Sequence, residues 1–142
     1  MAIEFEDIQN ASNTVNQRFQ RYKECYIGEP SFDQAFKSVL VNTFHQIHQA
    51  SPDVLIKYTE GFLTAINGLE KLTNSELRLP NNKLLEKTNI EIQGQIQFQG
   101  ASEALVFFLS WRQNKKTQGG FSCQPKDILA TMKNAALGIT IA

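Results

Sequence analysis

The fold class depends on residues 90–111, which read IEIQGQIQFQGASEALVFFLSW. In the first ten residues, Ile and Phe occupy even positions, with Gly94 among them, while Glu and Gln occupy odd positions. An alternation with a period of two is typical of a strand that has one face in the core and the other in water. The sequence therefore predicts a strand over about residues 89–99.

A run of six apolar residues, 104–109, makes up much of the second half of this stretch. Periodicity does not separate a buried strand from a buried helix in so short a run. Because the first strand needs a partner and the turn at 100–102 is short, we predict an antiparallel strand over about 103–112 at the centre of a sheet. A third strand at 120–123 would be an optional addition. A helix over 103–112 would instead make the protein nearly all helical.

Helical patterns flank this stretch on both sides. Apolar residues recur at helical spacing over about 5–26, 31–50 and 51–72, and again from residue 125 onward. We therefore predict an α+β fold in a single domain over residues 1–142. It has three N-terminal helices, a small antiparallel sheet and a C-terminal helix.

The third predicted helix has the clearest start, since Ser51 can cap it and Pro52 suits its first position. Gly61 and Gly68 lie inside this helix, where each costs about 1 kcal/mol relative to Ala. A tight crossing with another helix is the preferred explanation of these glycines, and a ligand-facing groove is the alternative. Near the other end of the chain, Gly138 is expected to end the last helix.

The charge balance disfavours a broad nucleic-acid surface. The chain has 142 residues, with 14 Lys and Arg against 14 Asp and Glu, so its formal net charge is zero. Binding to nucleic acid or to an anionic membrane is unfavoured without a long-range positive field. The longest apolar run is short and the first residues are acidic. We therefore expect neither a membrane span nor a signal peptide, and a cytoplasmic location.

Candidate chemical groups are few. The sequence contains no fixed-spacing motif such as GxSxG, a P-loop, GxGxxG or HExxH. His45 and His48 lie three residues apart on the second predicted helix and are the candidate metal ligands. A metal site needs a third ligand, and the sequence places neither Cys25 nor Cys123 near them. We therefore expect no metal, no cofactor and no catalytic residue, although the absence of a motif does not settle whether the protein is an enzyme.

The predicted strand over 89–99 also suggests a function, because it contains no Lys or Pro to protect its edge from pairing with another chain. We expect its polar face to contact a protein partner or a second copy in a homodimer. That face consists of Glu91, Gln93, Gln95, Gln97 and Gln99. The predicted function is a non-catalytic protein-interaction module of a bacterial adaptor, chaperone or inhibitor type. The alternative is a small-ligand-binding protein or an enzyme with a pocket between the third helix and the sheet.

Overall fold

The computed structural model describes residues 2–25, 32–117 and 124–141, and these residues are almost entirely helical. They form six α-helices and one 3₁₀ turn: α1 (Phe5–Cys25), α2 (Phe32–Ala50), α3 (Pro52–Glu70), η1 (Glu76–Arg78), α4 (Asn81–Thr88), α5 (Gln95–Thr117) and α6 (Pro125–Ile141). The bounds of the first three helices agree closely with those predicted from the sequence. The optional third strand at 120–123 lies outside the described residues.

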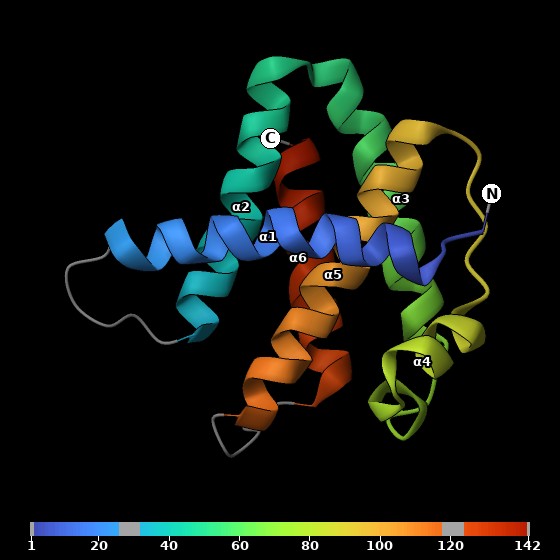
Figure 1. The fold of residues 1–142 in the computed structure, drawn as a ribbon. Coiled ribbons are helices and arrows are strands. Elements are labelled where there is room, and N and C mark those ends of the chain that lie inside the picture. The colour runs from blue at the N-terminus through green and yellow to red at the C-terminus, as the bar shows by residue number, and fades with distance from the viewer. Residues whose placement is uncertain (1, 26–31, 118–123, 142) are drawn as a thin grey trace.

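The helices pack around a central pair formed by α3 and α5, which make the most extensive contacts in the structure. In Figure 1, α1 runs crosswise over α5, and α6 lies behind α5. α6 packs against α3 and α2, and α2 also contacts α1. α5 therefore lies in the middle of the molecule, with α1 and α3 both packed against it.

The predicted α+β fold is wrong. Within the described residues, the only strand-like pairing is an isolated antiparallel bridge between Ala2 and Glu91, and no sheet forms. The predicted strand over 103–112 is part of α5. Every residue of the apolar run 104–109 is buried in this helix, because other helices surround it. A helix enclosed on all sides needs no polar face, so it shows no helical periodicity in the sequence.

The predicted strand over 89–99 is also wrong, although part of the pattern on which it rested is real. Ile90 and Ile92 are buried and Glu91 is exposed, as the alternation indicates. This segment is extended only as far as Gly94, whose φ of 131° lies in a region that favours glycine. The carbonyl of Gly94 then accepts a hydrogen bond from the Phe98 N–H at 2.9 Å, and α5 begins.

The crossing of α3 and α5 depends on two glycines that face each other's helix. A Cβ added to Gly61 of α3 would lie 1.8 Å from the Gln97 carbonyl oxygen, and one added to Gly100 of α5 would lie 2.0 Å from the Tyr58 carbonyl oxygen. The two backbones therefore approach more closely than any side chain allows. This confirms the prediction of a tight helix crossing at Gly61. A Cβ added to Gly68 would instead lie 2.9 Å from Cγ1 of the Ile90 side chain.

Capping accounts for the start of α3, but the predicted end of α6 is wrong. The Ser51 hydroxyl accepts a hydrogen bond from the Val54 N–H at 3.3 Å, as expected of a helix cap. Gly138 does not end the last helix, because α6 continues to Ile141.

Aromatic rings fill the space between α2, α3 and α5. The Phe62 ring packs edge-on against Phe44, with ring centroids 5.0 Å apart, and against Phe107 at 6.4 Å. Phe44 also packs edge-on against Tyr58, at 5.6 Å. These contacts fix the ring of Tyr58 and so fix the position of its hydroxyl.

In the described part of the chain, no helix is both long enough and apolar enough to cross a bilayer.

Candidate functional site

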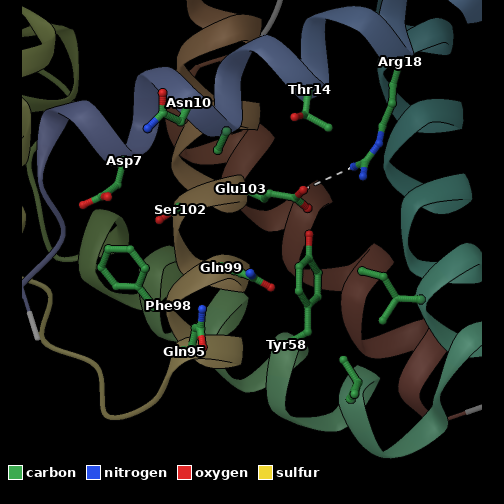
Figure 2. A pocket seen from close by; sticks show the side chains of 13 residues that line it. Asp7, Asn10, Thr14, Arg18, Tyr58, Gln95, Phe98, Gln99, Ser102 and Glu103 are labelled. Atoms are coloured by element: carbon green, nitrogen blue, oxygen red, sulfur yellow. Dashed lines mark hydrogen bonds and ion pairs between the residues drawn. The ribbon is translucent and has the colours of Figure 1, made fainter.

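A cleft of about 570 Å³ opens between α1, α3 and α5 (Figure 2). We call it the polar cleft, because most of the side chains on its walls can form hydrogen bonds. The wall from α1 consists of Asp7, Asn10, Ala11, Thr14 and Arg18. Asp7, Asn10 or Ala11, Thr14 and Arg18 follow one another at steps of three or four residues, which places all five on one face of the helix. α1 thus presents a continuous, mostly polar stripe to the cleft.

The opposite side of the polar cleft comes from α5 and α3. Gln95, Phe98, Gln99, Ser102 and Glu103 line it from α5, Val54 and Tyr58 from α3, and Ile47 from α2. The contribution of α5 again follows helical spacing. The glycine crossing holds the α3 backbone at Tyr58 against Gly100, so Tyr58 and the polar groups of α5 are fixed relative to each other.

An ion pair links the two sides. Arg18 Nη1 lies 3.3 Å from Glu103 Oε1, and the exposed fractions of these side chains are 32% and 14%. The same Arg18 nitrogen donates to Thr43 Oγ1 at 3.3 Å, and the Thr43 hydroxyl in turn donates to the Val39 carbonyl at 2.8 Å. The guanidinium is therefore anchored on α2 as well as on α5, which orients it in the cleft.

Glu103 is a buried carboxyl with an unusual proton affinity. Burial raises the pKa of Glu103 above its ordinary value, while the charge of Arg18 and its hydrogen bond offset part of the rise. Arg18 bonds to only one of the two carboxylate oxygens of Glu103, namely Oε1. A carboxyl perturbed by burial and by a specific charged partner, in a cleft, is typical of a functional site.

Three polar atoms on the walls of the polar cleft are buried but have no hydrogen-bond partner: Tyr58 Oη, Ser102 Oγ and Glu103 Oε2. Tyr58 is only 4% exposed and Ser102 only 3%. A buried polar atom left without a hydrogen bond costs about 1–3 kcal/mol. Figure 2 shows the Tyr58 hydroxyl directed toward the Glu103 carboxylate. These three atoms have essentially no accessible surface, so a molecule in the cleft would meet the exposed polar side chains of its lining instead, among them Asn10, Gln95 and Gln99.

The candidate metal ligands from the sequence do not belong to this site. His45 and His48 are exposed on α2 and do not line the polar cleft. No group of three His, Cys, Asp or Glu residues that could hold a metal ion occurs within the described residues. Cys123 lies outside those residues. The structure thus brings no third ligand to the two histidines in the part of the chain that it describes.

The five predicted contact residues do not share one strand edge. They are Glu91 and Gln93 in the extended segment and Gln95, Gln97 and Gln99 on α5. Gln95 and Gln99 line the polar cleft, whereas Gln97 Nε2 donates to Glu60 Oε2 of α3 at 2.8 Å. The edge-pairing argument for a homodimer therefore loses its basis, and contact of these residues with a partner stays a prediction.

Sequence reasoning missed the residues at the centre of the polar cleft. In the sequence, Tyr58 recurs at helical spacing with the apolar residues Leu55 and Phe62, and Arg18 lies among polar residues of the first predicted helix. One indication of the site was present, because Glu103 is the only charged residue between Glu91 and Arg112. A lone charge in a segment otherwise suited to the core requires a specific partner or a functional reason.

The walls of the polar cleft present carboxylate, hydroxyl, amide and guanidinium groups. No His or Cys is among its lining residues, so the thiol and imidazole combination available in the sequence does not occur there. Its ionisable side chains are Asp7, Arg18, Tyr58 and Glu103.

Comparison of the chain with protein-family models, with curated proteins and with solved structures found no match.

Proposed function

We propose that this protein is a non-catalytic binding protein that takes a small polar ligand into the polar cleft. The observation that supports this most directly is a cleft whose walls on α1 and α5 present exposed polar side chains, Asn10, Thr14, Gln95 and Gln99, together with the Arg18–Glu103 ion pair.

The size and position of the cleft support the same proposal. Its volume of about 570 Å³ lies within the range of about 300–1,000 Å³ that is usual for small-molecule sites. It is the ligand-binding alternative from the sequence, with one change of location. The expected pocket lay between the third helix and a sheet, and α5 takes the place of that sheet.

The surface gives less support to the protein-interaction hypothesis. Among the residues whose burial is described, the exposed large hydrophobics are Phe5, Val41 and Ile56. They belong to three different helices, α1, α2 and α3. A docking surface for a protein partner usually includes a contiguous apolar patch, and these three residues do not point to one. We therefore favour the small ligand.

A pair of matched variants on α1 tests the proposal. Asn10 is exposed and lines the polar cleft, so Asn10→Trp should fill it from the rim without disturbing the core. Asn13 is exposed one turn further along and does not line the cleft, so Asn13→Trp is the control. Each protein is labelled with ¹⁵N and titrated with a library of small amines, alcohols, amides, carboxylates and sugars.

We expect at least one compound to shift the amide resonances of α1, α3 and α5 around the cleft, in the natural protein and in Asn13→Trp but not in Asn10→Trp. The proposal fails if no compound shifts these resonances, or if the shifts survive in Asn10→Trp.

A further inference from the structure

Arg112 of α5 is a buried cation whose printed partners are all neutral, and only 7% of its surface is exposed. Its Nη1 donates to the carbonyls of Leu77 at 3.0 Å and Leu79 at 2.7 Å, and its Nη2 donates to Asn81 Oδ1. Within the described residues Arg112 forms no ion pair. Burial lowers the pKa of Arg112, and no acidic group of these residues offsets the change. Buried charges are usually paired with an opposite charge, so this cation calls for an explanation.

Two of the five donors of the Arg112 guanidinium have no partner among the described residues. The three bonds above account for both hydrogens of Nη1 and one of Nη2, which leaves the second Nη2–H and the Nε–H. Arg112 Nε is not among the described side-chain atoms that are both fully buried and unpartnered. Because it has no partner, it must have accessible surface. A molecule outside the protein can therefore accept a hydrogen bond from Arg112.

Arg112 lines a pocket of about 320 Å³, which we call the arginine pocket and which shares no lining residue with the polar cleft. The described lining includes a second arginine, Arg78, and no Asp or Glu. Leu79, Pro80 and Leu109 add apolar surface. The volume is at the small end of the range that is usual for small-molecule sites. The pocket thus combines two positive charges with a partly apolar wall.

Two further features add to the positive potential of the arginine pocket. Arg78 is exposed, its Nη2 donates to Gln124 Oε1 at 3.2 Å, and it forms no ion pair within the described residues. Asn81, the first residue of α4, also lines the pocket. The start of a helix carries partial positive charge, because its first backbone N–H groups have no acceptor within the helix. Each of these features favours an anion.

We propose that the arginine pocket binds a phosphate group, as inorganic phosphate or as the monoester of a small organic molecule, with Arg112 Nε and Arg78 as donors to its oxygens. A guanidinium matches an oxyanion because its planar donors can bond to two oxygens at once. Two arginines complement a dianion better than a carboxylate, and a phosphate monoester carries a charge of about −1.5 to −2 at neutral pH. This site is additional to the polar cleft and does not rest on the proposed function.

The Nε–H resonance of Arg112 tests the proposal without any mutation. The ¹⁵N-labelled full chain is titrated at neutral pH and constant ionic strength with inorganic phosphate, phenyl phosphate and acetate. We expect a phosphate compound to shift the Arg112 Nε–H resonance and the amides of residues 78–82, and acetate to bind about tenfold more weakly. Tighter binding of phenyl phosphate would identify a monoester as the ligand, and tighter binding of inorganic phosphate would identify the free ion. Both results support a phosphate site.

A matched pair of arginine variants assigns binding to the arginine pocket. Arg78→Gln removes an exposed charge of the pocket, and Arg21→Gln removes the same charge from α1, where the exposed Arg21 does not line it. Arg78→Gln should weaken phosphate binding about tenfold, the equivalent of one charge-assisted hydrogen bond, and Arg21→Gln should leave affinity within about twofold. Arg112→Lys keeps the charge but lacks the Nε–H, so it should also weaken binding about tenfold, with its fold checked by circular dichroism.

The possible results separate this proposal from the proposed function. The phosphate site is wrong if no phosphate compound shifts the Arg112 Nε–H resonance, or if acetate binds as tightly as phosphate. Equal weakening in Arg78→Gln and Arg21→Gln would also overturn it, because the effect would then be one of net charge only. Phosphate-induced shifts confined to the polar cleft would overturn it as well, while leaving the proposed function standing.

Discussion

Glu103 is a buried carboxyl whose raised pKa makes stability depend on pH in a defined direction. Because its pKa is higher in the folded than in the unfolded state, the folded protein holds this proton more tightly. Stability from this group should therefore fall as the pH rises from the ordinary carboxyl pKa through the raised one, and then level off. Glu103→Gln lacks this titration. Urea unfolding at several pH values should show the natural protein losing stability relative to Glu103→Gln across that window, and a relative gain with rising pH would contradict the assignment.

Arg112 is a buried cation that bonds to the connection before α4. Its Nη1 donates to the carbonyls of Leu77 at 3.0 Å and Leu79 at 2.7 Å, and its Nη2 donates to the side chain of Asn81. Arg112→Met should lower the free energy of unfolding by about 2–4 kcal/mol, because buried carbonyls lose their donors. Arg78→Met is the control, since Arg78 is exposed and should change stability by about 0.5 kcal/mol or less. Equal losses in the two variants, measured by urea unfolding, would show that Arg112 has no special role.

At the same scale, sequence reasoning identifies which residues are buried better than what their polar atoms do. Tyr58 recurs at helical spacing with the apolar residues of α3, and it is buried as that spacing indicates, with 4% of its surface exposed. Its side chain nevertheless lines a cleft that α1 completes. Because α1 is more than 30 residues away in sequence, no local pattern relates Arg18 to Tyr58 or to Glu103.

The contact between α3 and α5 is the element-scale feature on which the fold depends most. A Cβ at Gly100 would lie 2.0 Å from the Tyr58 carbonyl oxygen, and backbone atoms cannot move aside cheaply. Gly100→Ala should therefore destabilise the protein by about 3 kcal/mol or more. Gly138→Ala is the matched control in α6, where an added Cβ meets nothing within 4 Å. Replacing that helical glycine should instead stabilise by about 0.5–1 kcal/mol. Thermal unfolding of both variants measures the difference, and a tolerated Gly100→Ala would contradict the tight crossing.

The helices that could be predicted from the sequence are those with one face exposed to solvent. α1, α2 and α3 each border solvent, so the apolar positions on their core sides recur with helical spacing. α5 differs because its middle is enclosed by other helices, and residues 104–109 therefore carry no period at all. The two-residue alternation before it spans an extended segment and the first turn of a helix, with Gly94 at the change. The identity of α5 thus depends on tertiary packing that a local pattern does not contain.

For the molecule as a whole, the polar cleft is where α1 meets the α3 and α5 pair. A ligand in the cleft contacts all three helices and should hold α1 in place. We therefore expect the amides of α1 to exchange with solvent more slowly when ligand is bound, together with a rise in Tm. At a ligand concentration one hundred times Kd, the added stability is about 2.7 kcal/mol. Slower exchange confined to α6, which does not line the cleft, would place the ligand elsewhere.

The central claim is that a small ligand occupies the polar cleft between α1, α3 and α5. The most direct test is to record nuclear Overhauser effects between the protons of a bound small ligand and the side chains of the protein. We predict contacts with the Phe98 ring and with the methyl groups of Ala11 and Val54, which line the cleft from three different helices. Contacts found only with Val41, which is exposed on α2 outside the cleft, or with no side chain of the cleft, would contradict the claim.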